Sequence, residues 1–212
     1  MAIWLLPSDQ KATRSPQYRE LLAAVRSKPG MRAPLLLAFL DRFTVGFFTA
    51  GFPLMLAGVH EVEPAVIGML LAAFLYPFAL LSYPFGRIAE RATPLRLVAI
   101  GSLLYGATVS CVGIAPVNLM WVLMPLCGVF SAVMFIPTLL WLLDQSPGLG
   151  KTTAMAAFHS AGSLGFLLGP LVCGEIITNG DYGIAFAVAG MSEILAAILV
   201  VGVATRARRS SV

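Results

Sequence analysis

LMWVLMPLCGVFSAVMFIPTLLWLL, residues 119–143, is a run of mostly apolar residues that contains no charged side chain. A helix rises about 1.5 Å per residue, so about 20 apolar residues are enough to cross the roughly 30 Å of hydrocarbon in a bilayer. The length and composition of this run therefore predict a transmembrane helix.

Five more runs of this kind occur along the chain, at 33–58, 65–85, 97–115, 152–174 and 183–205. Hydrophobic residues make up 58% of the sequence and charged residues only 11%, and the mean hydropathy is +0.88. A soluble domain needs more polar surface than this composition supplies. We therefore expect an all-α, polytopic membrane protein with six transmembrane helices.

The basic residues fall on alternate sides of these runs. The connectors at 59–64, 116–118 and 175–182 contain no lysine or arginine. Short basic loops resist translocation and so mark the cytoplasmic side. The pattern predicts a multi-pass protein of the plasma (inner) membrane with both termini in the cytoplasm. The basic residues outside the runs are Lys11, Arg14, Arg19, Arg26, Lys28, Arg32, Arg87, Arg91, Arg96, Lys151, Arg206, Arg208 and Arg209.

The chain divides into three parts on this basis. A cytoplasmic segment covers 1–32, the six-helix bundle covers 33–205 and a basic tail covers 206–212. Residues 16–29 mix leucine and valine with arginine and lysine, a composition typical of a short helix that lies on an anionic membrane surface. A solvated linker fits the same residues equally well, so both interpretations are open.

The connector between the second and third runs reads GRIAERATPLR, residues 86–96. It resembles the cytoplasmic signature of the major facilitator superfamily, Gly-x-Leu-Ala-Asp-Arg-x-Gly followed by two basic residues. Thr93 replaces the second glycine. We expect Gly86 to let the chain leave its helix in a tight turn, and Glu90 to lie near the positive end of a neighbouring helix. An ordinary basic loop is the alternative. The motif residues are Gly86, Arg87, Glu90, Arg91 and Arg96.

A second pattern, GSLGFLLGPLVCG at 162–174, is similar to the Gly-Pro signature of the superfamily's fifth helix, which is prominent in antiporters. Gly165 and Gly169 lie four residues apart, so they share one helix face and allow another backbone to approach closely. Pro170 removes a backbone hydrogen bond and bends the helix. Helix packing alone is the alternative role. The motif residues are Gly162, Gly165, Gly169, Pro170 and Gly174.

The two patterns occur in the order, and on the side of the membrane, that the superfamily's fold requires. The resemblance implies one six-helix half of a twelve-helix transporter, built from two inverted three-helix repeats. A weak echo between 46–53 and 128–137 fits such repeats. The basic stretch before residue 33 looks like the superfamily's central loop, which favours the C-terminal half from a truncated reading frame.

Four ionisable side chains lie inside the apolar runs, where a charge is costly and commonly functional: Asp41, Arg42, His159 and Glu193. Arg42 and Glu193 both approach the middle of the membrane, so we expect them to form an ion pair. Asp41, about 100° around the helix from Arg42, is then expected to face the central cavity. Simple tethering of helices is the alternative role. The resemblance implies that the first, fourth and fifth helices line the pathway, which favours Asp41 over Glu193 as a solute contact.

These features predict secondary active transport of a small molecule by alternating access, with efflux or antiport favoured and a proton as a compatible coupling ion. The expected partners are the lipid bilayer, the solute and a second six-helix half or a homodimer, with no nucleic acid. A non-transporting membrane scaffold or a truncated, inactive transporter fragment is the alternative. No enzyme activity, cofactor or metal is expected. The segment GLGKTT at 148–153 lacks the first glycine and the preceding strand of a phosphate-binding loop.

Overall fold

A computed structural model of the chain describes residues 23, 25–91, 93–179 and 181–209, with 203–209 given by their backbone alone. Most of the segment at 16–29 and the last residues of the tail lie outside this part of the chain. Within it, a short 3-10 turn precedes six long helices, and no strand occurs. The elements are η1 (Pro29–Met31), α2 (Arg32–Gly58), α3 (Pro64–Arg91), α4 (Pro94–Val112), α5 (Val117–Asp144), α6 (Lys151–Asn179) and α7 (Tyr182–Arg209).

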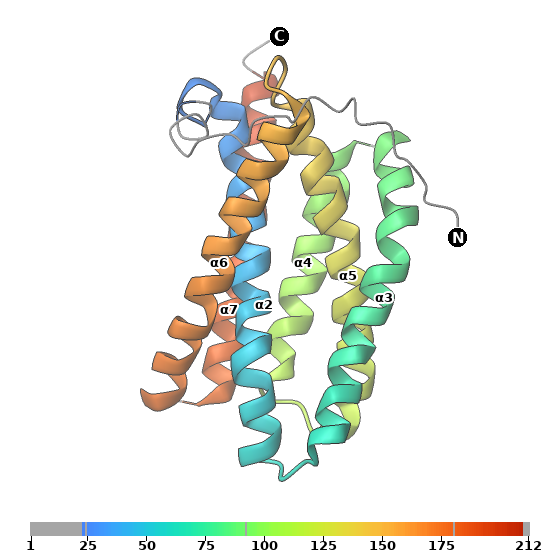
Figure 1. The fold of residues 1–212 in the computed structure, drawn as a ribbon, viewed down its shortest axis with the longest axis vertical. Helices are drawn as coiled ribbons and strands as arrows, with labels where there is room; N and C mark the ends of the chain where they lie inside the picture. The colour runs from blue at the N-terminus through green and yellow to red at the C-terminus, as the bar shows by residue number, and fades with distance from the viewer. Residues whose placement is uncertain (1–22, 24, 92, 180, 210–212) are drawn as a thin grey trace, which may run out of the picture.

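The six helices run along the long axis of the molecule, and their connectors lie at its two ends (Figure 1). Each helix is long and apolar enough to cross a membrane. The predicted all-α polytopic fold with six spans is therefore confirmed. The spans begin where turn residues allow: Pro64 and Pro94 are the first residues of α3 and α4, where the missing N–H has no helical partner to lose.

The predicted exit of the chain at Gly86 is wrong. Helix α3 continues to Arg91, and only residues 92 and 93 separate it from α4. Gly86 instead lies against α5, because a Cβ at this position would be 3.1 Å from Cγ2 of Ile136. The glycine therefore relieves crowding between two helices and does not form a turn.

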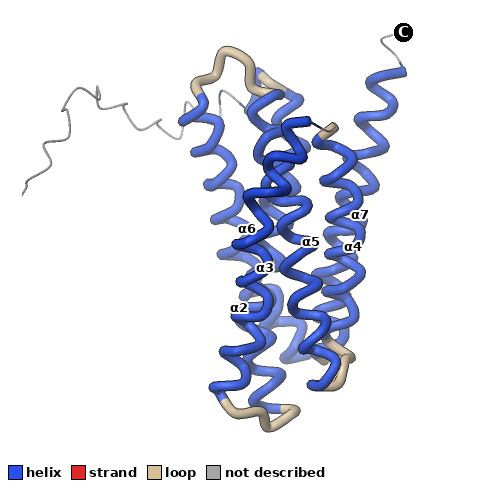
Figure 2. Tube along the Cα trace, turned by 90° about the vertical axis from the view of Figure 1, so that its right-hand side faces the viewer, coloured by secondary structure: helices blue, strands red, loops and turns tan. Residues whose placement is uncertain are grey.

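The helices pack mainly against partners that are distant in the sequence. The most extensive contacts join α2 to α6, α3 to α5, and α4 to both α5 and α7, whereas α2 and α3, or α5 and α6, touch little. Figure 2 shows α4 and α7 side by side along one edge. Exchange of the first three helices (α2–α4) with the last three (α5–α7) turns the contact of α2 with α6 into that of α5 with α3, and the contact of α4 with α7 into itself. The contact of α4 with α5 becomes that of α7 with α2, which is less extensive. This symmetry supports two three-helix repeats.

The glycines that begin the two echoing segments hold equivalent places in this arrangement. A Cβ on Gly46 would lie 2.7 Å from Cδ of Pro170 on α6, and a Cβ on Gly128 would lie 2.8 Å from Cγ of Pro77 on α3. Each glycine therefore lets a helix of the other repeat approach closely at a proline. Small residues at such crossings are how helices associate in lipid, where apolar burial gives little driving force.

A cluster of aromatic and aliphatic side chains fills one half of the bundle. Phe48 of α2 stacks on Phe74 of α3 with ring centroids 5.7 Å apart, and its ring lies 5.4 Å from that of Phe186 of α7. Beyond Phe74, the only residue of α3 that is buried is Ala89. Helix α3 therefore joins the core through its first turns and leaves most of its remaining length uncovered.

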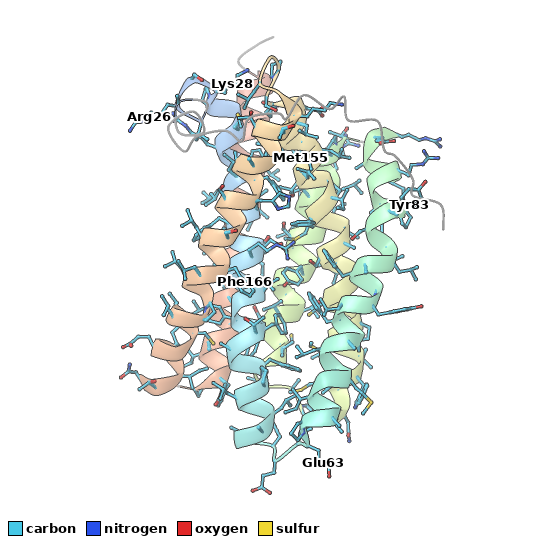
Figure 3. The ribbon with its side chains drawn as sticks, in the orientation of Figure 1. Arg26, Lys28, Glu63, Tyr83, Met155 and Phe166 are labelled. Carbon is cyan, nitrogen blue, oxygen red and sulfur yellow. The ribbon has the colours of Figure 1, made fainter. Side chains whose placement is uncertain are left out.

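The charged residues separate toward the two ends of the bundle. Figure 3 shows Arg26 and Lys28 at one end and Glu63 at the other. The Lys28 ammonium donates a hydrogen bond to the carbonyl of Pro147, which ties the start of the bundle to the connector between α5 and α6. At the opposite end, Asp181 accepts a hydrogen bond from the backbone N–H of Ile184 at 2.7 Å and caps α7.

Candidate functional site

A pocket of about 230 Å³ lies between α2 and α6. Phe166, one of the lining residues, lies near the middle of α6 (Figure 3), so the pocket is far from both ends of the bundle. The pocket is lined by Arg42, Phe158, His159, Gly162, Ser163 and Phe166.

The lining residues of α6 form one stripe because residues three, four and seven apart share a helix face. Gly162 lies at the centre of this stripe, and a Cβ there would be 3.0 Å from Cγ of Arg42. The absence of a side chain at Gly162 therefore makes room for the stem of Arg42. The stripe and Arg42 together define the pocket.

Arg42 is held by a carboxylate and an aromatic ring. Its Nε lies 3.6 Å from Oδ2 of Asp41, and its Cζ lies 4.3 Å from the ring centroid of Phe135 on α5. The side chain is 31% exposed, whereas that of Asp41 is 2% exposed. Among the described residues, no other acid pairs with Arg42. A guanidinium has several N–H donors, so most of them are available to a ligand.

The expectation that Asp41 faces a central cavity is wrong. Asp41 is buried between α2 and α5, where its Oδ1 accepts a hydrogen bond from Ser131 at 3.4 Å. Arg42, its neighbour in the sequence, faces the pocket instead. Arg42 therefore takes the place in the pocket that was expected of Asp41, whereas Asp41 lies on the inner side of α2 beside Ser131.

The expected ion pair between Arg42 and Glu193 does not form. Glu193 of α7 is fully buried, and neither of its carboxylate oxygens has a hydrogen-bond partner in the described part of the chain. It lies beside Ser102 of α4, within electrostatic range of Asp41. Arg42 extends toward α5 and α6, on another side of α2, so the two side chains point to different neighbours.

Behind Arg42 the structure contains a polar interior that the sequence analysis missed. The hydroxyls of Tyr105 and Thr44 are buried without a hydrogen-bond partner among the described residues. Buried polar groups in a low-dielectric medium are costly when unpaired. Their only sequence signal was a scatter of hydroxyl residues within apolar runs. Beside the predicted Asp41 and Glu193, the polar side chains buried there are Thr44, Ser102, Tyr105 and Ser131.

Of the four predicted pathway residues, the structure brings two into one pocket, Arg42 and His159. The His159 ring is exposed in the isolated chain and lies 5.9 Å from the ring of Phe158, edge to face. Asp41 contacts the pocket only through Arg42. Glu193 lies elsewhere in the core. The aromatic walls of the pocket were missed because phenylalanine is common in any apolar run.

The Gly-Pro motif of α6 lies along α2. A Cβ on Gly165 would collide with the carbonyl oxygen of Phe39, and one on Gly169 would lie 2.9 Å from Cα of Gly46. Gly174, by contrast, has no other atom within 4 Å of such a Cβ. The first two glycines therefore set how closely α6 approaches α2, and with it the position of the pocket lining.

The residues of the motif at 86–96 lie at the end of the bundle, away from the pocket. The guanidinium of Arg87 lies 5.9 Å from the ring centroid of Tyr83 on the same helix. Glu90, Arg91 and Arg96 are exposed. Across the described ranges, the only ion pair is that between Arg42 and Asp41, so these charges have no acidic or basic partner within the bundle.

In the part of the chain that the structure describes, no group of histidine, cysteine, aspartate and glutamate side chains is arranged to hold a metal.

A family model described as Major Facilitator Superfamily matches residues 35–211, which includes nearly all of the six helices. A comparison with curated proteins finds no match.

Proposed function

Because the chain belongs to the Major Facilitator Superfamily, a family of membrane transporters of small solutes, we propose that it is a secondary transporter that works by alternating access, with the Arg42 pocket on its pathway. The resemblance found at 86–96 and 162–174 agrees with the family match. Family membership also makes solute transport, and not enzyme activity, the expected function.

The observation that carries this proposal is the position of Arg42. A cation within the hydrocarbon region is costly unless it is paired or reaches water, and such residues commonly mark solute and ion pathways. Arg42 is only partly paired, by one long contact to Asp41, and its side chain is 31% exposed in an open pocket. A residue that served only to join helices would be enclosed by them.

A second six-helix bundle is part of the proposal. The apolar windows of α3 and α6 are 17% and 22% buried, against 39–50% for the other four helices, so these two present the most uncovered surface. Because α6 also lines the pocket, a bundle docked against it would supply the missing wall. We infer that this bundle is a second six-helix half, of the same or another polypeptide, or a second copy of this chain.

The orientation is proposed from the distribution of charge. The end of the bundle that carries Arg26 and Lys28 is assigned to the cytoplasm of a cell with an inner membrane, because basic loops are retained on that side. This places both termini inside. The Gly-Pro pattern of α6 supports efflux or antiport, and Asp41, next to Arg42, is the acid best placed to couple transport to a proton.

The competing function is a non-transporting scaffold or an inactive fragment. The observation that favours it is the missing wall of the pocket, since a single bundle does not enclose a pathway. The two functions differ in whether any solute moves.

The test is flux through the purified full chain in liposomes, recorded as current on a solid-supported membrane and as uptake of labelled solute. A panel of small anions, cations and neutral solutes is applied to the wild type and to Arg42→Gln. We expect a saturable signal for at least one solute in the wild type and its loss in the variant. Absence of saturable flux for the whole panel, with protein correctly inserted, would contradict transport by this chain and favour the scaffold or the inactive fragment.

A further inference from the structure

We infer that the solute recognised in the Arg42 pocket is a small organic anion with a flat apolar body, its carboxylate or equivalent group bound by the Arg42 guanidinium. This inference rests on the proposed function and adds to it the class of solute. It depends on the charge, the walls and the size of the pocket.

The charge of the lining selects an anion. No residue that lines the pocket is acidic, and Asp41, the acid nearest to Arg42, is buried behind it. Asp41 engages Nε by a single contact of 3.6 Å, which leaves the other N–H donors of the guanidinium without an ion-pair partner in the described chain. A carboxylate fits such donors in a charge-assisted, two-point geometry, whereas a cationic solute would be repelled.

Two polar side chains beside Arg42 can complete the recognition. His159 and Ser163 lie one helical turn apart on α6 and both line the pocket. An imidazole N–H and a hydroxyl can each donate one hydrogen bond to an oxygen of the solute. Together with Arg42, these two side chains provide hydrogen-bond donors from two helices to the same pocket.

The remaining walls select an apolar, flat body. Phe158 and Phe166 line the pocket, and Phe166 is 44% exposed in the isolated chain. The ring of Phe135, on which Arg42 rests, lies 5.4 Å from that of Phe158 in an edge-to-face arrangement. Aromatic walls pack favourably against another ring. This half of the pocket holds about 230 Å³, which is room for a small solute, and the proposed second bundle would close its open side.

The experiment compares three probes that share one ring and differ in charge: benzoate, benzamide and benzamidinium. Their dissociation constants are measured with the full chain in lipid nanodiscs by calorimetry, and binding is checked by the shift of thermal unfolding. We expect benzoate to bind at least about tenfold more tightly than benzamide, because an extra charge-assisted hydrogen bond is worth that factor or more. Benzamidinium is expected to bind more weakly than either.

Variants assign the preference to the pocket. Arg42→Gln should reduce the preference for benzoate over benzamide to about one, and Arg42→Lys should keep part of it. Arg87→Gln is the matched control, because Arg87 also lies over an aromatic ring but far from the pocket. If Arg42→Gln fails to fold, Ser163→Phe serves instead, since Ser163 is exposed and its replacement fills the pocket without disturbing the core.

Three results would overturn the inference: no binding of benzoate to the wild type at millimolar concentration, equal binding of benzamide or benzamidinium, or a benzoate preference that survives Arg42→Gln or Ser163→Phe. None of these three results contradicts the proposal of transport, because that proposal is tested separately by flux of the broader solute panel. Saturable flux of cations or neutral solutes alone would support the proposal of transport and contradict the inference that the solute is an anion.

Discussion

Ser131 on α5 places its hydroxyl 3.4 Å from the carboxylate of Asp41 on α2, so the acid is held in the interior of the bundle. The same carboxylate lies 3.6 Å from Nε of Arg42, whose side chain extends to the pocket. Asp41 therefore has two neighbours and no direct access to a solute. Any effect of this acid on binding has to pass through Arg42.

Asp41→Asn tests that coupling. Loss of the negative charge next to Arg42 removes the repulsion of an anionic solute, so we expect the dissociation constant of benzoate to fall several-fold. Release of a more tightly held solute is slower, so the maximal rate of transport should fall by a similar factor.

Calorimetry and flux measured on the same preparation separate this outcome from simple damage, because a merely structural role of Asp41 would weaken both binding and transport. Asp144→Asn, which changes an exposed acid at the end of α5, is the matched control. Unchanged binding and flux in Asp41→Asn would remove Asp41 from the mechanism.

Gly165→Ala tests the contact between α2 and α6. The added methyl group would meet the carbonyl oxygen of Phe39, a backbone atom that moves only if the helices separate. We expect a loss of about 1–3 kcal/mol in the free energy of unfolding, the usual effect of overpacking. Gly174→Ala on the same helix adds its methyl to open space and should leave stability unchanged or slightly higher. Thermal unfolding in detergent measures both, and equal effects would contradict the assigned packing.

Phe135→Leu tests the ring beneath Arg42. A cation over an aromatic face gains roughly 0.5–1 kcal/mol at a partly exposed site, so loss of the ring should weaken benzoate binding about two- to fivefold through a less fixed guanidinium. Phe78→Leu removes a ring that contacts Phe135 but not Arg42, and it should change binding less. An equal loss in the two variants would mean that general packing, and not the cation, is responsible.

Single cysteines test the orientation. In a Cys111→Ser background, Glu63→Cys and Asp181→Cys are expected to react with an impermeant maleimide from outside intact cells, whereas Arg91→Cys should react only after permeabilisation. Cys127 and Cys173 can stay, because both are buried in the bundle. Labelling of Arg91→Cys in intact cells together with Glu63→Cys would refute the proposed topology.

The six spans and the family were predictable from the sequence because both depend on local signals. Hydropathy over a window of 20 residues finds a span without knowledge of its neighbours, and the motifs at 86–96 and 162–174 are contiguous. Even the repeat left a local trace, the glycines at 46 and 128, which proved to lie at equivalent helix crossings.

The arrangement of the site was less predictable. Depth along a helix follows from counting residues, and Arg42 and Glu193 were expected to meet on that basis alone. Rotation of each helix about its axis is set by packing at Gly162, Gly165 and Gly169, which the sequence does not report as a direction. Ser131 and Phe135 were missed for a related reason, since an uncharged residue in a continuous apolar run carries no sign of which neighbour it touches.

The equivalence of Gly46 and Gly128 extends to the residues four positions before them, which are Arg42 and Met124. Arg42 opens into the pocket, whereas Met124 is fully buried in the aromatic half of the bundle. The two repeats have thus diverged at this position, one copy bearing a cation and the other a thioether. The half of the bundle toward Lys28 therefore offers a charged group to a solute, whereas the equivalent position toward Glu63 is closed by apolar packing, so the two faces of the membrane are chemically unequal.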